Sequence, residues 1–353
     1  MDQKILIIQH KMIGDVLTSS ILCEAIKYKY PNAIVHYLIN EHTLPVLENN
    51  PYIDQKVVFT PEMVKSRKAA KQFRSQLAPH AYDIVIDVYS KIGSARITKA
   101  TKAKQRIGYK KWYTKTFYTN LYTYHYIPET EAGLAIENRM KLLQAIATDF
   151  PKALKPKLYV TEEEIAFAKA KLAGVKTSSE QKLYMIGILG SSQNKTYPLP
   201  YLATLLDHIV ATTQAQLLFN YIPKQIDQVE TLYQLCSEKT QQHIQKDIYG
   251  KSLREFIALT TQCDALIGNE GGAINMAKAI DIPTFAIFSP WIRRAAWALY
   301  ENDHNHVVHL QDYEAALYTS KSLKDIKKRH EHYYSLLKPE MILEKLDEFI
   351  AIT

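Results

Sequence analysis

Short apolar runs and longer amphipathic stretches follow one another along this chain in a regular order. The apolar runs suit strands that are buried on both faces, as in a parallel sheet. They occupy residues 5–8, 33–39, 56–59, 82–88, 184–189, 216–221, 265–268 and 284–289. Apolar residues at helical spacing fill residues 16–30, 61–78, 133–147, 199–212, 224–237, 252–263 and 271–280. This alternation predicts an α/β protein with parallel sheets.

The strand–helix series occurs twice, and a proline-containing, polar region separates the two occurrences. Pro151, Pro156 and the turn-like stretch 176–180 interrupt the pattern there. We therefore expect two facing Rossmann-like domains, residues 1–165 and 166–353, with the crossing near residues 150–181. The last amphipathic helix, residues 339–350, is expected to cross back and pack on the first domain.

Composition limits the class of protein further. The 353 residues suit two domains, and 47% of them are apolar, as in ordinary globular proteins. No apolar run is long enough for a membrane-spanning helix or a signal-peptide core. The three cysteines, Cys23, Cys236 and Cys263, are far apart, which favours small core residues in a reducing cytoplasm.

The net charge of +8 favours an anionic partner, and the positive charge is concentrated in one segment. Residues 91–126 contain nine Lys or Arg, no Asp or Glu, and many aromatic residues. A solvated rim is the simplest interpretation. Nucleic-acid binding would need exposed aromatic residues for stacking, and no recognised nucleic-acid motif accompanies the segment, so no nucleic acid is expected.

One acidic residue stands at the point where the first strand leads into the first helix. Gly14 permits a tight turn there, and Asp15 follows it. Ligands of open α/β sheets bind at the carboxyl ends of the strands. Asp15 is thus a candidate general base, metal ligand or helix N-cap, and spacing alone favours the cap.

A second candidate site combines glycines with a lysine. Glu270, Gly271 and Gly272 lie between a strand and a helix, where backbone N–H groups can bind a phosphate. Lys195 lies in the loop after the first strand of the second series and suits a phosphate, with Ser191 and Ser192 as further donors. A plain helix cap and a solvated lysine are the simpler alternatives.

Four blocks of the chain, in the right order, resemble glycosyltransferase family 9, the ADP-heptose:lipopolysaccharide heptosyltransferases. They are residues 4–17, residues 82–87 with 106–109, residues 190–198, and residues 268–290. The resemblance covers most of the chain. It implies the GT-B fold and an inverting transfer of heptose, or a related sugar, from a nucleotide donor, most simply ADP-heptose, to a lipopolysaccharide or lipooligosaccharide core. It implies no cofactor and no catalytic metal.

The resemblance also implies roles for individual residues. Asp15 would be the catalytic base, and Lys195 would hold the donor phosphates. Donor binding would fall to Ser191, Ser192, Gln225, Glu270, Gly271, Gly272 and Asn275. Acceptor binding would fall to Lys11, Gly14, Arg106, Lys110 and Lys111. The basic, aromatic segment would face an anionic glycolipid and the inner leaflet, which places the protein in the cytoplasm, peripherally on the plasma membrane.

Departures from the family pattern lie mainly on the donor side. Glu270 and Gly271 replace the family's Asp and Thr, Asn275 replaces His, and Gln225 replaces Glu. They leave two alternatives open, namely a non-catalytic nucleotide-sugar or glycan binder and a sugar-nucleotide epimerase of the same fold. Two further groups are ambiguous: Arg293 and Arg294 could reach phosphate or lie in solvent, and His304, His306 and His309 could bind a metal or belong to a surface loop.

Overall fold

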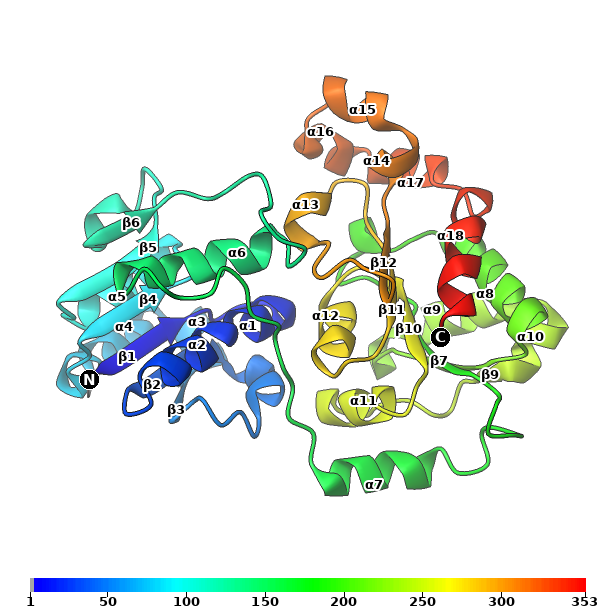
Figure 1. Ribbon diagram of the computed structural model, residues 1–353, viewed down its shortest axis with the longest axis horizontal. Helices are drawn as coiled ribbons and strands as arrows, with labels where there is room; N and C mark the ends of the chain where they lie inside the picture. Colours follow the sequence, from blue (N-terminus) through cyan, green and yellow to red (C-terminus); the bar gives the residue numbers. More distant parts are fainter. Residues whose placement is uncertain (1–2) are drawn as a thin grey trace. The chain divides into compact units, whose positions relative to one another are not determined.

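The computed structural model describes residues 3–353 and divides the chain into two compact units between Tyr159 and Val160. The first unit runs from blue to green in Figure 1, and the second from green to red. The division lies inside the expected crossing, residues 150–181. The expected boundary at 165/166 falls within helix α7, Glu162–Lys171, which belongs to the second unit.

The first unit contains a parallel six-stranded sheet in the order β3-β2-β1-β4-β5-β6. Its strands are β1 (Lys4–Ile8), β2 (Ile34–Asn40), β3 (Gln55–Phe59), β4 (Ile84–Asp87), β5 (Gln105–Tyr109) and β6 (Asn120–Tyr122). Its α-helices are α1 (Ile13–Ser19), α2 (Ile21–Lys29), α3 (Pro61–Lys65), α4 (Arg67–Ser75), α5 (Ile92–Ala100) and α6 (Leu134–Lys141). The central strand β1 is flanked by β2 and β4, so its apolar run is buried on both sides.

The second unit repeats this plan with a parallel sheet in the order β12-β11-β10-β7-β8-β9. Its strands are β7 (Leu183–Gly187), β8 (Gln216–Phe219), β9 (Ile244–Gln245), β10 (Ala265–Asn269), β11 (Thr284–Ile287) and β12 (Asn305–Val308). Besides α7, its main helices are α8 (Leu199–Thr213), α9 (Ile226–Leu235), α10 (Glu238–His243), α11 (Leu253–Thr260) and α12 (Gly272–Ala279). The chain ends in α13 (Arg294–Trp297), α14 (Leu310–Tyr313), α15 (Ala315–Ser320), α16 (Leu323–Lys328), α17 (His330–Leu336) and α18 (Glu340–Ala351).

The C-terminal helix α18 corrects one expectation. Its buried residues Ile342, Leu346 and Phe349 belong to the hydrophobic core of the second unit, where Phe349 packs against Phe285. Figure 1 shows the helix in red beside α8, within that unit. The prediction that it packs on the first unit is wrong, because periodicity reveals an apolar face but not what covers it.

The first predicted helix, residues 16–30, is two helices in the structure. Serine side chains donate to carbonyls about one turn back, from Ser19 to Asp15 at 2.7 Å and from Ser20 to Leu17 at 2.8 Å. Such back-bonding competes with the regular helical ladder. The helix is therefore interrupted at Ser20, between α1 and α2.

Candidate active site

Asp15 lies in the first turn of α1, at the carboxyl edge of the first sheet. The strand β1 ends at Ile8, and Met12, with φ of 63°, precedes the helix. No side chain caps this helix, so the interpretation of Asp15 as an N-cap is wrong. The helix is fixed against the sheet by the Tyr37 hydroxyl, which donates to the carbonyl of Val16 at 2.8 Å.

The side chain of Asp15 is instead held by an arginine from α6. Arg139 Nη2 donates to Asp15 Oδ1 at 2.7 Å, and Arg139 Nε donates to Ser19 Oγ at 2.8 Å. The arginine side chain is 8% exposed, whereas that of Asp15 is 28% exposed. A buried cation therefore orients a carboxylate that stays accessible, which suits a group that accepts a proton from a bound substrate.

Arg139 was not predicted from the sequence. One signal was available, because Arg139 stands at helical spacing between Ile136 and Leu143 on the apolar side of a predicted helix. A charged residue in that position needs a buried partner. The partner is 124 positions away along the chain, so no local pattern could identify it.

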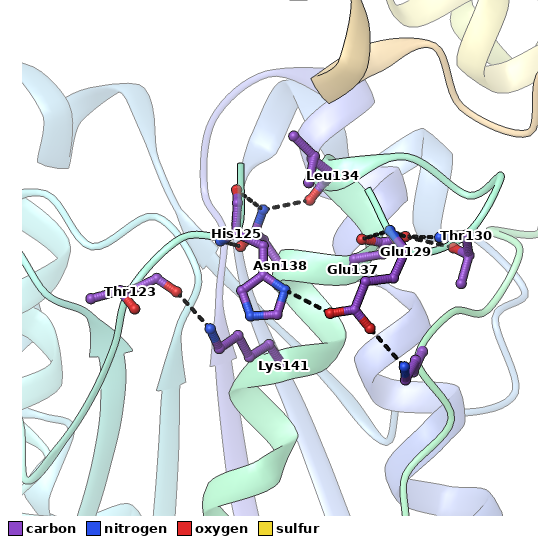
Figure 2. Close-up of polar contacts among 9 residues, drawn as sticks. Thr123, His125, Glu129, Thr130, Leu134, Glu137, Asn138 and Lys141 are labelled. Atoms are coloured by element: carbon purple, nitrogen blue, oxygen red, sulfur yellow. Dashed lines mark hydrogen bonds and ion pairs between the residues drawn. The ribbon is translucent and has the colours of Figure 1, made fainter. Parts of the chain in front are cut away.

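The helix α6 that carries Arg139 is tied to the segment 123–130, as Figure 2 shows. The carboxylate of Glu137 accepts hydrogen bonds from the backbone N–H groups of Glu129 and Thr130 at 2.9 and 2.6 Å. Asn138 accepts from the backbone N–H of His125 at 2.6 Å, and Lys141 donates to the carbonyl of Thr123 at 3.0 Å. These contacts fix the position of the helix and hence of Arg139.

A cavity of about 360 Å³ opens at the carboxyl ends of β1, β2 and β3. It is lined by Lys11, Met12, Asn40, Glu41, Phe59 and Lys65, among others. The amide oxygen of Asn40 is buried without a hydrogen-bond partner. Next to it, burial and then the charges of Lys11 and Lys91 lower the pKa of His10 to about 4, so this histidine is neutral at pH 7. Lys11 thus lies at a concave, partly polar surface.

The other residues predicted to bind the acceptor differ in their location and contacts. Lys110 and Lys111 follow β5 at the same carboxyl edge, and Lys111 Nζ donates to the carbonyl of Tyr89 at 3.3 Å. Burial lowers the pKa of Lys111. Arg106 is different, because its guanidinium donates to the carbonyls of Phe117 and Ala103 at 2.9 and 2.6 Å. Those contacts stabilise the loops around β5, and acceptor binding by Arg106 stays a prediction.

In the second unit, the structure brings Lys195 and Glu270 together. Lys195 Nζ lies 3.3 Å from Glu270 Oε2, and both side chains are mostly buried. Lys195 follows β7 and Glu270 follows β10, and these strands are neighbours in the sheet. The two residues therefore meet at the carboxyl edge, where ligands of such sheets bind.

Buried polar contacts fix the loop that carries Lys195. Asn269 at the end of β10 accepts from the backbone N–H of Tyr197 at 2.6 Å and donates to the carbonyl of Gly187 at 3.0 Å. The carbonyl of Asn194 accepts from Ser289 Oγ at 2.8 Å and from Trp291 Nε1 at 2.7 Å. None of these bracing contacts was predicted from the sequence.

The remaining donor candidates lie around this loop. Gly271 directly precedes α12, Gly272 begins it, and Asn275 is buried within it. Ser191 and Ser192 are exposed in the loop before Lys195. Gln225 follows the neighbouring strand β8, and its side-chain oxygen accepts from the backbone N–H of Ile222 at 2.9 Å. That contact shapes a local turn and leaves the amide nitrogen of Gln225 for other uses.

The sequence left the roles of several histidines and arginines open, and those described next make contacts within the second unit. His309 is fully buried, its Nδ1 accepts from the backbone N–H of Gln311, and burial lowers its pKa to about 4. His306 packs on Phe349. Among residues 3–353 no group of three or more metal-ligating side chains is found, and the histidine trio forms no such group. Arg294 is paired with Glu301 at 2.6 Å, so it is held within its own unit.

The family model of glycosyltransferase family 9 (heptosyltransferase) matches residues 70–327. The chain belongs to glycosyltransferase family 9. This confirms the resemblance and makes the protein a glycosyltransferase. A curated relative, lipooligosaccharide heptosyltransferase 2 of Haemophilus influenzae, is 25% identical over 366 residues and covers 98% of this chain and 99% of its own length.

Solved structures confirm the GT-B fold of this family 9 glycosyltransferase. The glycosyl transferase family 9 protein of Veillonella parvula has a TM-score of 0.76 at 17% identity, over 99% of this chain and 98% of its own. The ADP-heptose lipopolysaccharide heptosyltransferase II of Escherichia coli has a TM-score of 0.69 at 17% identity, over 94% and 98%. Within residues 3–353, no helix combines the length and apolarity that crossing a bilayer requires.

Proposed function

We propose that this enzyme transfers a heptose from ADP-heptose to a sugar hydroxyl of a lipopolysaccharide or lipooligosaccharide core, with inversion at the anomeric carbon. Family membership and the names of similar proteins support the substrates. The observation that carries the chemistry is the accessible carboxylate of Asp15, oriented by the buried Arg139 at the carboxyl edge of the first sheet.

Asp15 would take the proton of the acceptor hydroxyl as its oxygen attacks the anomeric carbon. The bond from that carbon to the donor phosphate breaks at the same time, and ADP leaves. Because the attack comes from the face opposite the leaving group, the configuration inverts. Arg139 keeps the carboxylate in place while it accepts the proton.

Charge develops on the departing ADP, and Lys195 would stabilise it together with the backbone N–H groups at the start of α12. Glu270 would hold the lysine until the donor binds. Lys195 and these N–H groups would supply the positive potential that a metal ion provides in other transferases, so we propose a metal-independent reaction. Unchanged turnover in EDTA is the expected result, and loss of turnover that Mg²⁺ restores would contradict it.

The acceptor is an anionic glycolipid in this proposal, so the enzyme would work peripherally at the cytoplasmic face of the membrane. Lys11 at the 360 Å³ cavity, with Lys110 and Lys111 beyond β5, supports an anionic acceptor. Gly14, beside Asp15 in α1, would let the acceptor approach the helix closely.

The deciding experiment compares Asp15→Asn with Asp149→Asn, an aspartate of the same unit that is paired with a lysine. Asp15→Asn should lower kcat at least about a thousandfold and leave the Kd of ADP-heptose within about twofold, because only proton transfer is lost. Asp149→Asn should behave as wild type. Full transfer by Asp15→Asn would contradict the mechanism, and donor binding without transfer in wild type would favour a non-catalytic binder.

A further inference from the structure

The indole of Trp291 has two lysines placed against it in the second unit. Lys195 Nζ lies 5.6 Å from the centre of the ring, and Lys327 Nζ lies 3.9 Å from it. Both distances start from the same ring centre, so the distance between the two ammonium groups cannot exceed the two added together. Trp291 is itself held by its Nε1–H, which donates to the carbonyl of Asn194.

The two lysines differ in how their charge is balanced. Lys195 is paired with Glu270. For Lys327, no carboxylate partner is found in residues 3–353, and its side chain is exposed. The backbone of α16 is fixed by its Ser322 cap and by the fully buried Ile326, and the contact with Trp291 places the ammonium group of Lys327. The fold thus holds an unbalanced cation beside the lysine of the candidate donor site.

Glu270 balances the charge of Lys195, whereas the indole face compensates for the charge of Lys327 only in part. An anion that contacts both ammonium groups would supply the missing negative charge. A diphosphate suits this arrangement better than a monophosphate, because it carries more negative charge over a greater length. The nearby start of α12 adds backbone N–H groups to the same edge of the sheet.

We propose that Lys327 and Lys195, arranged around Trp291, form one anion subsite that binds the diphosphate of the nucleotide substrate. The anion subsite rests on one part of the proposed function, namely that the donor is a nucleoside diphosphate sugar. Lys327 comes from α16, far along the chain from the Lys195 loop. It would be a further donor-positioning residue that no sequence block identified.

The test is calorimetric titration of the full chain with ADP, inorganic pyrophosphate and adenosine. Lys327→Gln should raise the Kd of ADP and of pyrophosphate about fivefold to tenfold and leave adenosine unchanged. The matched control is Lys328→Gln, which alters the neighbouring exposed lysine of the same helix and should stay within about twofold of wild type. Lys327→Arg should restore binding, because guanidinium binds phosphate and stacks on indole.

Unchanged ADP and pyrophosphate binding by Lys327→Gln would overturn the proposal. So would an equal loss of adenosine binding, which would indicate local structural damage, or a failure of wild type to bind pyrophosphate. The proposed function is tested separately. If wild type binds pyrophosphate through Lys327 but transfers no heptose, the transfer proposal fails and the anion subsite stands.

Discussion

The carboxylate of Asp15 accepts a hydrogen bond from Arg139 at 2.7 Å, and the same guanidinium reaches Ser19 on the next turn of α1. One arginine thus fixes both the helix and the proposed base. A lysine at this position has a single nitrogen, which cannot take the places of both Nε and Nη2 of the guanidinium. We expect Arg139→Lys to lower kcat about tenfold or more, with the Kd of the donor unchanged.

The control for this prediction is Ser19→Ala, which removes one contact of Arg139 and leaves the ion pair with Asp15. It should lower kcat less than Arg139→Lys does. Thermal unfolding of each variant shows whether the fold is retained. Wild-type kcat in Arg139→Lys would mean that the arginine only stabilises the packing of α1 on α6.

The chain's patterns predicted the central strands well, because each is a continuous apolar run buried on both faces. They missed β5, β6, β9 and β12, where polar residues interrupt the apolar run. In the candidate site, Asp15, Lys195 and Glu270 follow strands and could be predicted. Arg139 and Trp291 could not, since each acts through contacts about a hundred residues or more away.

A second prediction concerns Gly190, which stands where β7 leads into the Lys195 loop. A Cβ at Gly190 would lie 2.2 Å from the carbonyl oxygen of Lys195, so the loop backbone would have to move. We expect Gly190→Ala to raise the Kd of ADP about tenfold by displacing Lys195. Gly93→Ala is the control, because a Cβ there meets no atom within 4 Å. It lies in α5 and should bind ADP normally, with stability equal to or above wild type.

A third prediction follows from Asp87, a fully buried carboxyl at the end of β4. It accepts hydrogen bonds from the Ser90 backbone at 2.8 Å and from the Tyr118 hydroxyl at 2.7 Å. Burial outweighs these bonds and raises the pKa of Asp87 from 3.8 to about 6. The folded state therefore holds this proton more tightly than the unfolded state, so its contribution to stability is greatest below pH 3.8 and is lost as the pH rises to about 6.

Asp87→Asn removes this titration while keeping the shape of the side chain. Between about pH 4 and 6.5, the free energy of unfolding of wild type should fall relative to that of Asp87→Asn by on the order of 3 kcal/mol, and the difference should then be constant. Urea unfolding of both proteins across this range measures it. A difference that does not change with pH would show that Asp87 has the same pKa in both states.

The last prediction concerns membrane contact through the basic, aromatic segment 91–126. Trp112 in this segment is 86% exposed and directly follows Lys110 and Lys111, a combination that suits the interface of an anionic bilayer. We expect the protein to sediment with vesicles that contain phosphatidylglycerol and not with purely zwitterionic ones, and salt should weaken the binding.

Replacing Trp112 separates insertion of the indole from simple charge attraction. Trp112→Ala should reduce vesicle binding several-fold, because an exposed indole is the group that would enter the interface. The matched control is Tyr28→Ala in α2, an aromatic residue with 88% exposure that lies outside the basic segment and should bind as wild type. Equal binding by Trp112→Ala and wild type would mean that the segment is a solvated rim.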